Sequence, residues 1–562
     1  MMPTPTFRLT RSALLAVLLL PLAVPASSQA NVSLPHSAHA GSHIISGIVL
    51  SAKSGLPLPD AEVTLTNVGG NPFQAATTTN DNGEFAFSNL ADAKYSIHAS
   101  HRGYITAAFQ EHGGYSTAIV IGPDQITTGI KLTLDPNAVL FGIVSEDSGD
   151  PVPQARLALY RIDHASGIEK THRAGDAATD NLGNYEFSNL APGNYYLAVI
   201  AKPWYATQPQ PATNLATGKA DSNRPRSPLD LVYPITYYAD VTDANSATPI
   251  PVAAGERISV NFSLHPLPSI HLTVQVQKST NNRILSFPQL HQDLFGASEF
   301  ASPTSMNTQD DRSPTTTTVE LTGLAPGHYE VELPAQSGSS SRTASIDAVN
   351  GQESLDLTSA VSLPDLTGKL LMPGAEPPKN LSISLRPRDG ESWNNARVEP
   401  DGSFHMQSIH PGTYDVLINA DGGAYAVNRL TAKGAKASGS ALTAGSEAIE
   451  LTVSIAQSSA TVSGFAKLNG KPAPGVFVLL VPAHFSADGQ LPECDQSDSD
   501  GSFEFARVPP GEYTAIAIQE GWTLDWARPE VLHSYLARGE RVTILAQAKE
   551  IKLKDPIEAQ PK

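Results

Sequence analysis

The chain has 562 residues, a formal net charge of −18, one cysteine, 42 glycines and 44 prolines. A surface this acidic disfavours nucleic acid and anionic lipid as main partners, because both are themselves negatively charged. The single cysteine excludes a disulfide within the chain, and the length allows several domains that each bury a core.

The N-terminal residues have the pattern of a secretory signal peptide. Arg8 and Arg11 precede an apolar run over 13–24, and small residues follow it. The run is shorter than the roughly 20 apolar residues of a spanning helix. We therefore expect a signal peptide over 1–30, a flexible segment over 31–42, and an extracytoplasmic protein (periplasmic, cell-surface or secreted) without an integral membrane segment. An uncleaved anchor is the alternative.

One short sequence motif recurs along the chain: a turn glycine, an aromatic residue two positions later, and a tyrosine twelve positions after the glycine. The four full copies are Gly83-Glu84-Phe85 with Tyr95, Gly183-Asn184-Tyr185 with Tyr195, Gly402-Ser403-Phe404 with Tyr414, and Gly501-Ser502-Phe503 with Tyr513. A degraded copy keeps Gly327-His328-Tyr329 but has Thr317 in place of the turn glycine. Repetition at this spacing predicts a series of similar small domains.

The motif predicts a simple local structure. A glycine after Asp or Asn tolerates a positive φ and makes a tight hairpin turn. Phe85 and Phe87 then point to the same face of the next strand, towards a core. The tyrosine begins the following strand, with its ring inside and its hydroxyl on a backbone partner.

Alternating segments such as 61–65 and 451–455 have the strand period of two, and helical periodicity is scarce. We therefore expect an all-β protein, a tandem array of about five β-sandwich domains. The expected limits of the repeats are 43–136, 137–268, 269–360, 361–460 and 461–556. The second repeat contains a long loop, 203–252, and the fifth a short helix, 529–538, with Pro529 at its start and Gly539 just past its end.

These residues resemble the carboxypeptidase regulatory-like domain of bacterial type. The resemblance rests on Ile45-Ser46-Gly47-Ile48-Val49, on the recurring turn motif, and on Ala191-Pro192-Gly193 before Tyr195. It implies a seven-stranded prealbumin-like or carbohydrate-binding-like sandwich that serves as an accessory module. The first repeat departs from the pattern at Asp92-Ala93, where Pro-Gly is expected, and the third keeps only the end that leads to Tyr329.

Polar clusters offer weak candidates for metal sites. Asp495, Asp498 and Asp500 loosely resemble a calcium loop but lack its full ligand pattern, so a hairpin turn is the competing interpretation. His36, His39 and His43 cluster near the start of the mature chain, whereas His98 and His101 have strand spacing that sends them to opposite faces. We therefore expect no metal and no cofactor.

Catalytic motifs are missing from the sequence. It contains no His-Glu-x-x-His, no Gly-x-Ser-x-Gly and no Gly-Lys-Ser/Thr motif. Cys494 has no histidine or basic neighbour in sequence that would activate it as a nucleophile. We therefore expect no enzyme, and a hydrolase with a triad dispersed over loops is the third alternative for function.

Aromatic residues outside the predicted strands, which we expect to be exposed, are the main functional candidates. Flat rings beside polar groups bind sugars or protein hot spots. The tentative ligand-binding set is Trp204, Tyr205, Tyr237, Tyr238, Trp393, Trp522 and Trp526. The competing interpretation is that these rings cap the ends of the sandwiches.

The sequence thus predicts a non-catalytic exported binding or scaffold protein. Its partner would be a polysaccharide, bound through the loop aromatics, or an envelope protein. The alternative is a structural spacer at the bacterial cell envelope, because serial sandwiches form rods.

Overall fold

The structure is a computed structural model that describes residues 41–69, 73–122, 127–206, 227–278, 286–309, 313, 315–335, 340–349, 351–372, 380–389, 393–420, 425–456, 460–545 and 548–562. The predicted signal peptide, all but the last two residues of the predicted segment 31–42, and the middle of the long loop lie outside these residues. Within them, no helix is both long and apolar enough to cross a membrane.

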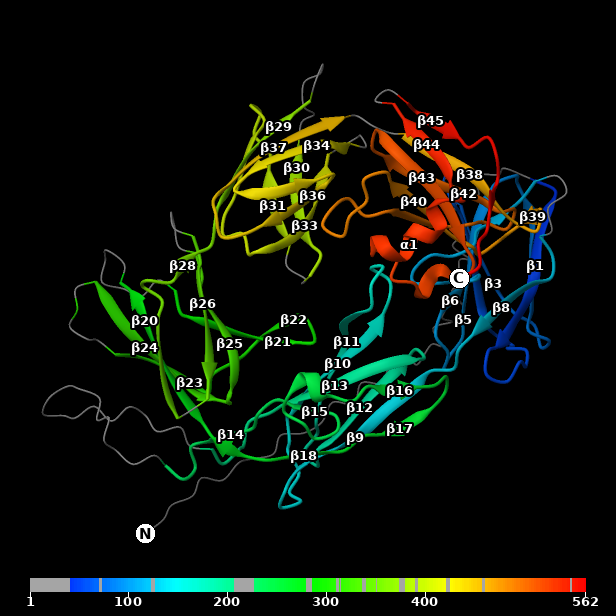
Figure 1. Cartoon of the computed structure of the whole chain (residues 1–562). Helices are drawn as coiled ribbons and strands as arrows, with labels where there is room; N and C mark the ends of the chain where they lie inside the picture. Colours follow the sequence, from blue (N-terminus) through cyan, green and yellow to red (C-terminus); the bar gives the residue numbers. More distant parts are fainter. Residues whose placement is uncertain are drawn as a thin grey trace, which may run out of the picture.

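The described chain is almost entirely β-structure, as expected, and its sheets occur in pairs along the sequence (Figure 1). The first pair has the orders β4–β1–β8 and β3–β2–β5–β6, with β7 also on β5. The strands are β1 (His43–Ser51), β2 (Glu62–Asn67), β3 (Gln74–Thr78), β4 (Glu84–Leu90), β5 (Lys94–Ser100), β6 (Ala107–Ala108), β7 (Ile119–Val120) and β8 (Ile130–Leu134). Phe85, Phe87 and Tyr95 lie in the core between the two sheets.

The second sandwich combines β12–β9–β17, with β18 also on β9, and β11–β10–β13–β15, with β16 also on β13. Its elements are β9 (Ala138–Glu146), β10 (Arg156–Asp163), β11 (Lys170–Ala178), β12 (Asn184–Leu190), β13 (Gly193–Ile200), β15 (Thr236–Tyr237), η1 (Ala244–Ser246), β16 (Ile250–Val252), β17 (Arg257–Ser259) and β18 (Phe262–Leu264). A two-stranded ribbon of β14 (Leu231–Val232) and β19 (Leu267–Pro268) leads to the third sandwich.

The third sandwich has the orders β23–β24–β20–β27 and β22–β21–β25–β26–β28. Its strands are β20 (Ile270–Gln277), β21 (Gln289–Leu294), β22 (Ala297–Phe300), β23 (Ser305–Gln309), β24 (Thr316–Leu324), β25 (Gly327–Leu333), β26 (Arg342–Ala348), β27 (Gln352–Asp356) and β28 (Val361–Ser362). This is the repeat whose turn glycine is missing, and it still pairs two sheets over one core.

The fourth sandwich has the orders β32–β29–β37–β34 and β31–β30–β33–β36–β35. Its strands are β29 (Leu366–Leu371), β30 (Ser382–Pro387), β31 (Asn394–Arg397), β32 (Ser403–Met406), β33 (Gly412–Asn419), β34 (Ala426–Lys433), β35 (Ala435–Ser438), β36 (Ala441–Ala444) and β37 (Ile449–Ala456). Its core is continuous between the two sheets.

The fifth sandwich has the orders β39–β38–β42, with β45 and β46 also on β38, and β41–β40–β43–β44. Its elements are β38 (Ala460–Leu468), β39 (Lys471–Pro472), β40 (Phe477–Pro482), β41 (Glu493–Gln496), β42 (Ser502–Val508), β43 (Gly511–Ile518), η2 (Gly521–Thr523), α1 (Pro529–Leu536), β44 (Glu540–Ile544), β45 (Glu550–Lys552) and β46 (Ile557–Glu558). Helix α1 lies where Pro529 and Gly539 predict one. The domain limits given above stay a prediction.

The repeated tyrosine makes the same contact in every copy of the motif. Its ring is in the core, and its hydroxyl donates to the backbone carbonyl four residues earlier, as the sequence predicts. The donor–acceptor distances are 2.7–3.1 Å for Tyr95, Tyr195, Tyr329, Tyr414 and Tyr513. Each hydroxyl thus fixes the turn that precedes its own strand.

The motif makes a second contact that the sequence does not indicate. The residue before the turn acid or amide is Thr79, Thr179 or Ser497, and its hydroxyl both donates to one backbone carbonyl and accepts from one backbone N–H. In the first sandwich these partners are the Leu58 carbonyl and the Ala61 N–H. The hydroxyl therefore ties the turn to the loop between the first two long strands.

We expect Tyr329→Phe to lower the stability of the third sandwich by about 1–3 kcal/mol, because the buried Ala325 carbonyl loses its donor. Hydrogen exchange across β24 and β25 measures this loss. Tyr104→Phe is the control, since the Tyr104 hydroxyl makes no hydrogen bond within the described residues, and it should change exchange far less. Equal effects of the two substitutions would contradict the role assigned to the hydroxyl.

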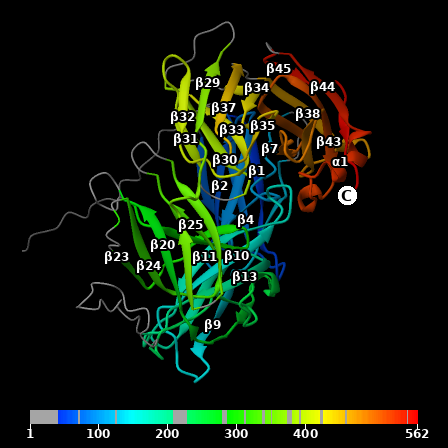
Figure 2. The same cartoon turned by 60° about the vertical axis from the view of Figure 1, so that its left-hand side comes forward.

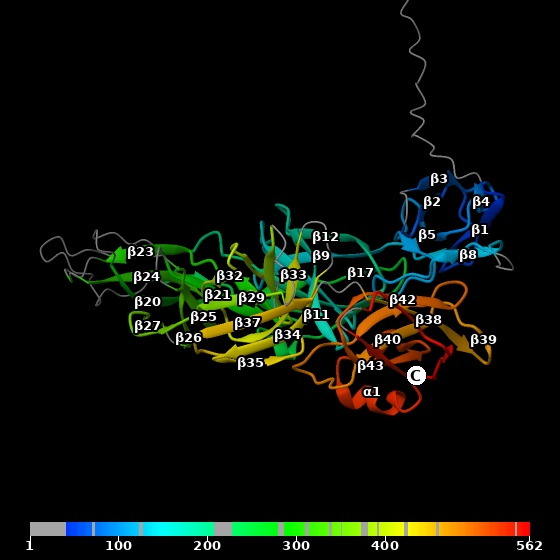
Figure 3. The same cartoon turned by 90° about the horizontal axis from the view of Figure 1, so that it is seen from above.

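The sandwiches contact one another. Chain neighbours are joined at Lys53–Gly255, Arg156–Glu299, Ser341–Ser408 and Arg388–Ala487. Other contacts cross the array, at Lys170–Asp389, Ala527–Gly167 and Lys94–Asp498. Figure 1 shows the first sandwich (blue) beside the fifth (red), and Figure 3 shows the same pair from above. The fourth and fifth also lie together in Figure 2. A straight rod would keep its two ends apart, so this chain is not arranged as one.

Candidate functional site

Trp204 and Trp393 are exposed, as the sequence predicts. Trp204 is 81% exposed and Trp393 is 50% exposed. Trp204 meets the half-buried Tyr205 edge to face, with ring centroids 5.7 Å apart and planes at 84°. Trp204 is therefore an open indole face with a second aromatic ring beside it.

Polar groups hold the base of this aromatic pair. The Tyr233 hydroxyl donates to the carboxylate of Glu146, at the end of β9. Burial and this carboxylate both raise the pKa of Tyr233, and burial with the same carboxylate raises that of Tyr205. Both phenols therefore stay neutral. Tyr233 is buried with its proton in the bond to Glu146, so Tyr205 provides the accessible hydroxyl at the edge of the Trp204 pair.

Tyr237 and Tyr238 are placed differently from the expectation of open loop rings. Tyr237 is only 4% exposed, and burial raises its pKa to about 12. Its ring contacts Phe295 of the third sandwich at 5.3 Å, and Phe295 also stacks on Tyr196 at 4.4 Å. Tyr238 is half-buried against the core of the second sandwich. The expected exposure of Tyr237 is therefore wrong, because the third sandwich covers it.

A partly buried ion cluster accompanies this aromatic contact. Glu299 of β22 accepts from Arg156 and Arg173 and from the hydroxyl of Tyr160, all on the second sandwich. The Glu299 side chain is 13% exposed and that of Arg156 is 44% exposed, so the cluster is partly shielded from water. Phe295 and Glu299 could not be identified from the sequence, because their partners are remote in it.

Trp526 is also buried, at 7% exposure, so the expectation that it lies open is wrong. It packs near Phe477 of its own sandwich and against the turn at Gly167 between β10 and β11. The Ala527 N–H donates to the Gly167 carbonyl at 2.8 Å. Figure 1 shows this β10–β11 hairpin reaching towards α1. Trp526 therefore joins the fifth sandwich to the second.

Trp522 joins the fifth sandwich to the first. Its ring is parallel to that of His112, with centroids 5.5 Å apart and planes at 2°, and lies 5.3 Å from Tyr115. Its indole Nε1 is buried and makes no hydrogen bond within the described part of the chain. Trp522 is half-buried. The loop aromatics of the fifth repeat thus contact other sandwiches.

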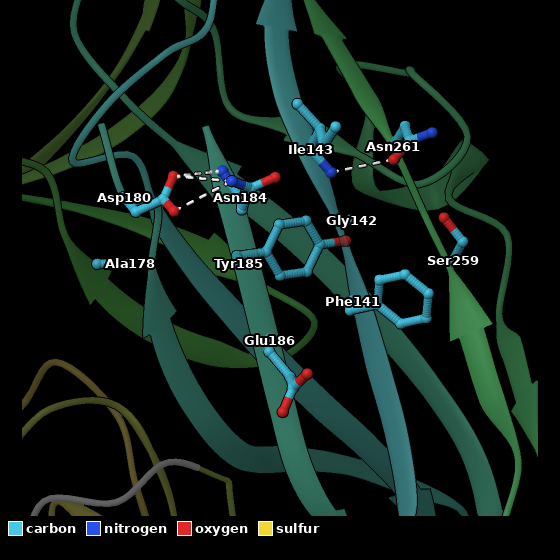
Figure 4. Close-up of a pocket in the computed structure, with 10 residues that line it drawn as sticks. All are labelled: Phe141, Gly142, Ile143, Ala178, Asp180, Asn184, Tyr185, Glu186, Ser259 and Asn261. Carbon is cyan, nitrogen blue, oxygen red and sulfur yellow. Dashed lines mark hydrogen bonds between the residues drawn. The ribbon is translucent and has the colours of Figure 1, made fainter. Parts of the chain in front are cut away.

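A hollow of about 510 Å³ lies on the second sandwich, over β9, β12 and β17 (Figure 4). Asp180 accepts from the Asn184 amide, which lowers its pKa, and Asn261 accepts from the Ile143 N–H. The Arg257 guanidinium lies over the Phe141 ring at 5.0 Å. These polar groups stabilise the local backbone and contain no nucleophile next to a base.

The first sandwich has a hollow at the equivalent place, lined by Gly47 and Phe85 where the second has Gly142 and Tyr185. Both hollows are therefore a consequence of the repeat and its strand glycine.

The acidic turn of the fifth repeat is occupied by a lysine. Lys94 Nζ lies 2.6 Å from the carboxylate of Asp498. No group of ligands suitable for a metal occurs among the described residues. His36 and His39 lie outside them, and His43 pairs with Asp92. Cys494 is half-buried, and burial raises its pKa well above the usual value, which disfavours the reactive thiolate.

Comparison with known proteins gives the following. The sequence profile of the carboxypeptidase regulatory-like domain matches residues 44–134. No curated protein matches the sequence. Among solved structures, GBS52, the minor pilin of Streptococcus agalactiae, has 14% identity and a TM-score of 0.21, covering 40% of this chain and 97% of its own.

A streptococcal ancillary pilin has 11% identity and a TM-score of 0.20, covering 56% of this chain and 98% of its own. At such low scores these similarities transfer no function to this chain. The match of the family profile confirms the resemblance to the carboxypeptidase regulatory-like domain for residues 44–134, the first sandwich of the array.

Proposed function

We propose that this chain is a non-catalytic, exported scaffold protein that binds polysaccharide through Trp204 and Tyr205. The observation that carries the proposal is the exposure of Trp204, because an indole ring that is 81% open beside a second aromatic side chain is a stacking surface for a sugar ring. The Tyr205 hydroxyl and the Glu146 carboxylate at its edge supply hydrogen-bonding groups of the kind that sugar hydroxyls need.

The contacts between sandwiches support the scaffold part of the proposal. Six of the seven candidate rings lie in or near the second and fifth sandwiches, and three of them, Tyr237, Trp522 and Trp526, contact another sandwich. These rings hold modules together. Trp204 and Trp393 stay exposed, and of the two only Trp204 has a second ring beside it among the described residues. A docked array holds such a surface in a fixed orientation, which lowers the entropy lost on binding.

The test is affinity electrophoresis of the mature chain through a panel of polysaccharides. We expect at least one glycan to retard the native chain. Trp204→Ala should abolish the retardation, because stacking of a sugar on one aromatic ring contributes a large part of such weak binding. Trp393→Ala is the matched control, because Trp393 is also exposed but makes no ring contact within the described residues. Retardation that is unchanged in Trp204→Ala would contradict the proposed site.

Protein binding, or a structural role in the cell envelope, is the second candidate. The extensive contacts between modules favour it, because they show that these sandwich surfaces are suited to binding other sandwiches. Absence of retardation on every glycan would favour this candidate over the first. A hydrolase stays third, and turnover of an ester, peptide or glycan substrate by the native chain would establish it.

A further inference from the structure

The first and fifth sandwiches, which are the two ends of the array, contact each other. Several of the hydrogen bonds between them are made by one short turn of the fifth sandwich. The turn between β41 and β42 places Asp498 against Lys94 at 2.6 Å and against the Ala118 N–H at 3.1 Å. Ser499 exchanges two bonds with the edge of the first sandwich: its N–H donates to Ala118, and its hydroxyl accepts from Val120.

A glutamine extends this contact into the first sandwich. Gln496 Nε2 donates to the Gln110 carbonyl at 2.6 Å and to the Thr117 hydroxyl at 2.8 Å. Beside it, the Trp522 ring stacks on His112. Gln496 and Thr117 are almost fully buried, so these bonds form out of water, where an unpaired polar group would be costly.

In other copies of the motif, the equivalent turn has no partner in another sandwich among the described residues. Asn80 and Asp180, at the equivalent place in the first and second repeats, are exposed and bond only within their own turns among the described residues, whereas Asp498 is buried. The position of Lys94, just before the repeated tyrosine, is held elsewhere by Asn194, His328, Thr413 and Glu512. Both halves of the ion pair are therefore special to the two sandwiches that meet.

The chemistry of the contact is that of a separable interface. Apart from the aromatic group, it consists of hydrogen bonds and one ion pair, which is typical of domain interfaces that open and close. Among the described residues, Lys94 is the one cation that pairs there, and it also faces Asp500 and Glu504, which do not bond to it. Burial lowers the pKa of Lys94, but the three carboxylates raise it on balance, so the acidic turn attracts the Lys94 charge and favours closure.

We propose that Lys94, Asp498 and the groups around them form a latch that holds the array closed and that releases the first sandwich from the fifth when it breaks. Opening the latch separates the half-buried Trp522 ring from His112 and Tyr115, while the other contacts along the chain stay intact. This inference concerns the shape of the molecule and does not rest on the binding of glycan at Trp204.

The test is a disulfide trap across the latch. Val120→Cys and Ser499→Cys place thiols on two residues that the 2.8 Å bond from the Val120 N–H to the Ser499 hydroxyl brings together, in a Cys494→Ser background. Ser499→Cys removes that hydroxyl in every variant compared, so differences in rate report on the ion pair. We expect rapid oxidation in the closed chain. Adding Lys94→Glu or Asp498→Lys should slow it by roughly tenfold or more, because each leaves like charges facing each other in a partly buried contact.

The charge-swapped variant, with both Lys94→Glu and Asp498→Lys, distinguishes a latch from damage to the fold. We expect it to restore part of the lost rate, since the ion pair is rebuilt in the opposite sense while the bond from the Ala118 N–H to the Asp498 carboxylate is still lost. Lys433→Glu is the matched control, because Lys433 and Glu450 pair within the fourth sandwich, and it should leave the rate unchanged.

Two results would overturn the proposal. One is an unchanged rate in both single variants, which would mean that the ion pair does not hold the contact. The other is a charge-swapped variant that is as slow as the single variants although its melting temperature equals that of the native chain.

Discussion

Trp526→Ala is expected to destabilise the fifth sandwich by about 3–5 kcal/mol and to free it from the second. The indole is 7% exposed and packs with Phe477 and Leu532 in a cluster separate from the main core of that sandwich. A carbon added at Gly167 would lie 2.6 Å from the ring, so the β10–β11 turn rests directly on it. Removing the ring therefore leaves a cavity and also withdraws the surface on which this turn packs.

Hydrogen exchange of the full chain measures both effects. We expect faster exchange in β40, β43 and α1, and also at Ala527, whose N–H bonds to Gly167 in the second sandwich. Trp393→Ala removes the same side chain from an exposed site and should change exchange only locally. Protection of the fifth sandwich that is equal in the two variants would show that Trp526 is not a packing residue.

Gly142→Ala is expected to have the second large effect, a loss of about 4 kcal/mol or more from the second sandwich. Gly142 lies in β9 at the centre of its sheet, and a Cβ there would lie 1.7 Å from the carbonyl oxygen of Val260. That oxygen accepts from the Tyr185 hydroxyl at 2.6 Å, and the Val260 N–H donates to Phe141. A methyl group would push this backbone away and break both bonds.

Gly175→Ala is the matched control, because Gly175 also lies in a strand of the second sandwich but its Cβ would have its nearest neighbour at 3.8 Å. We expect a change of less than about 1 kcal/mol there. Calorimetry of the full chain should show one transition shifted down by Gly142→Ala and unshifted by Gly175→Ala. If both substitutions leave every transition in place, the second sandwich does not need the close approach of β9 to Val260.

Much of the fold follows from the sequence because the responsible interactions are local. The turn glycine adopts a positive φ of 73° at Gly83 and 81° at Gly501, and the repeated tyrosine bonds only four residues back. Such short-range features, together with the strand period, predict sandwiches. They hold even in the third repeat, where Thr317 replaces the glycine and the strands still pair.

The surface between sandwiches could not be predicted in this way. Lys94 and Asp498 are 404 residues apart, and no periodicity connects them. For the same reason the aromatic loops were recognised as unusual, but sequence alone gave no means to separate Trp204, which lies open, from Trp526, which another module covers. The one available signal was a lysine at a position that is uncharged or acidic in the other copies.

The pairing of the first strand in each sandwich has a mechanical consequence. In the first sandwich β1 runs parallel to β8 from Gly47–Ile130 to Ser51–Leu134, and in the fourth β29 runs parallel to β37. The chain thus enters at one end of such a pair and leaves at the other. Tension along the chain slides the two strands past each other, and because the hydrogen bonds of a parallel pair are evenly spaced, they bear the load together. Each module resists pulling in shear and does not unzip one bond at a time.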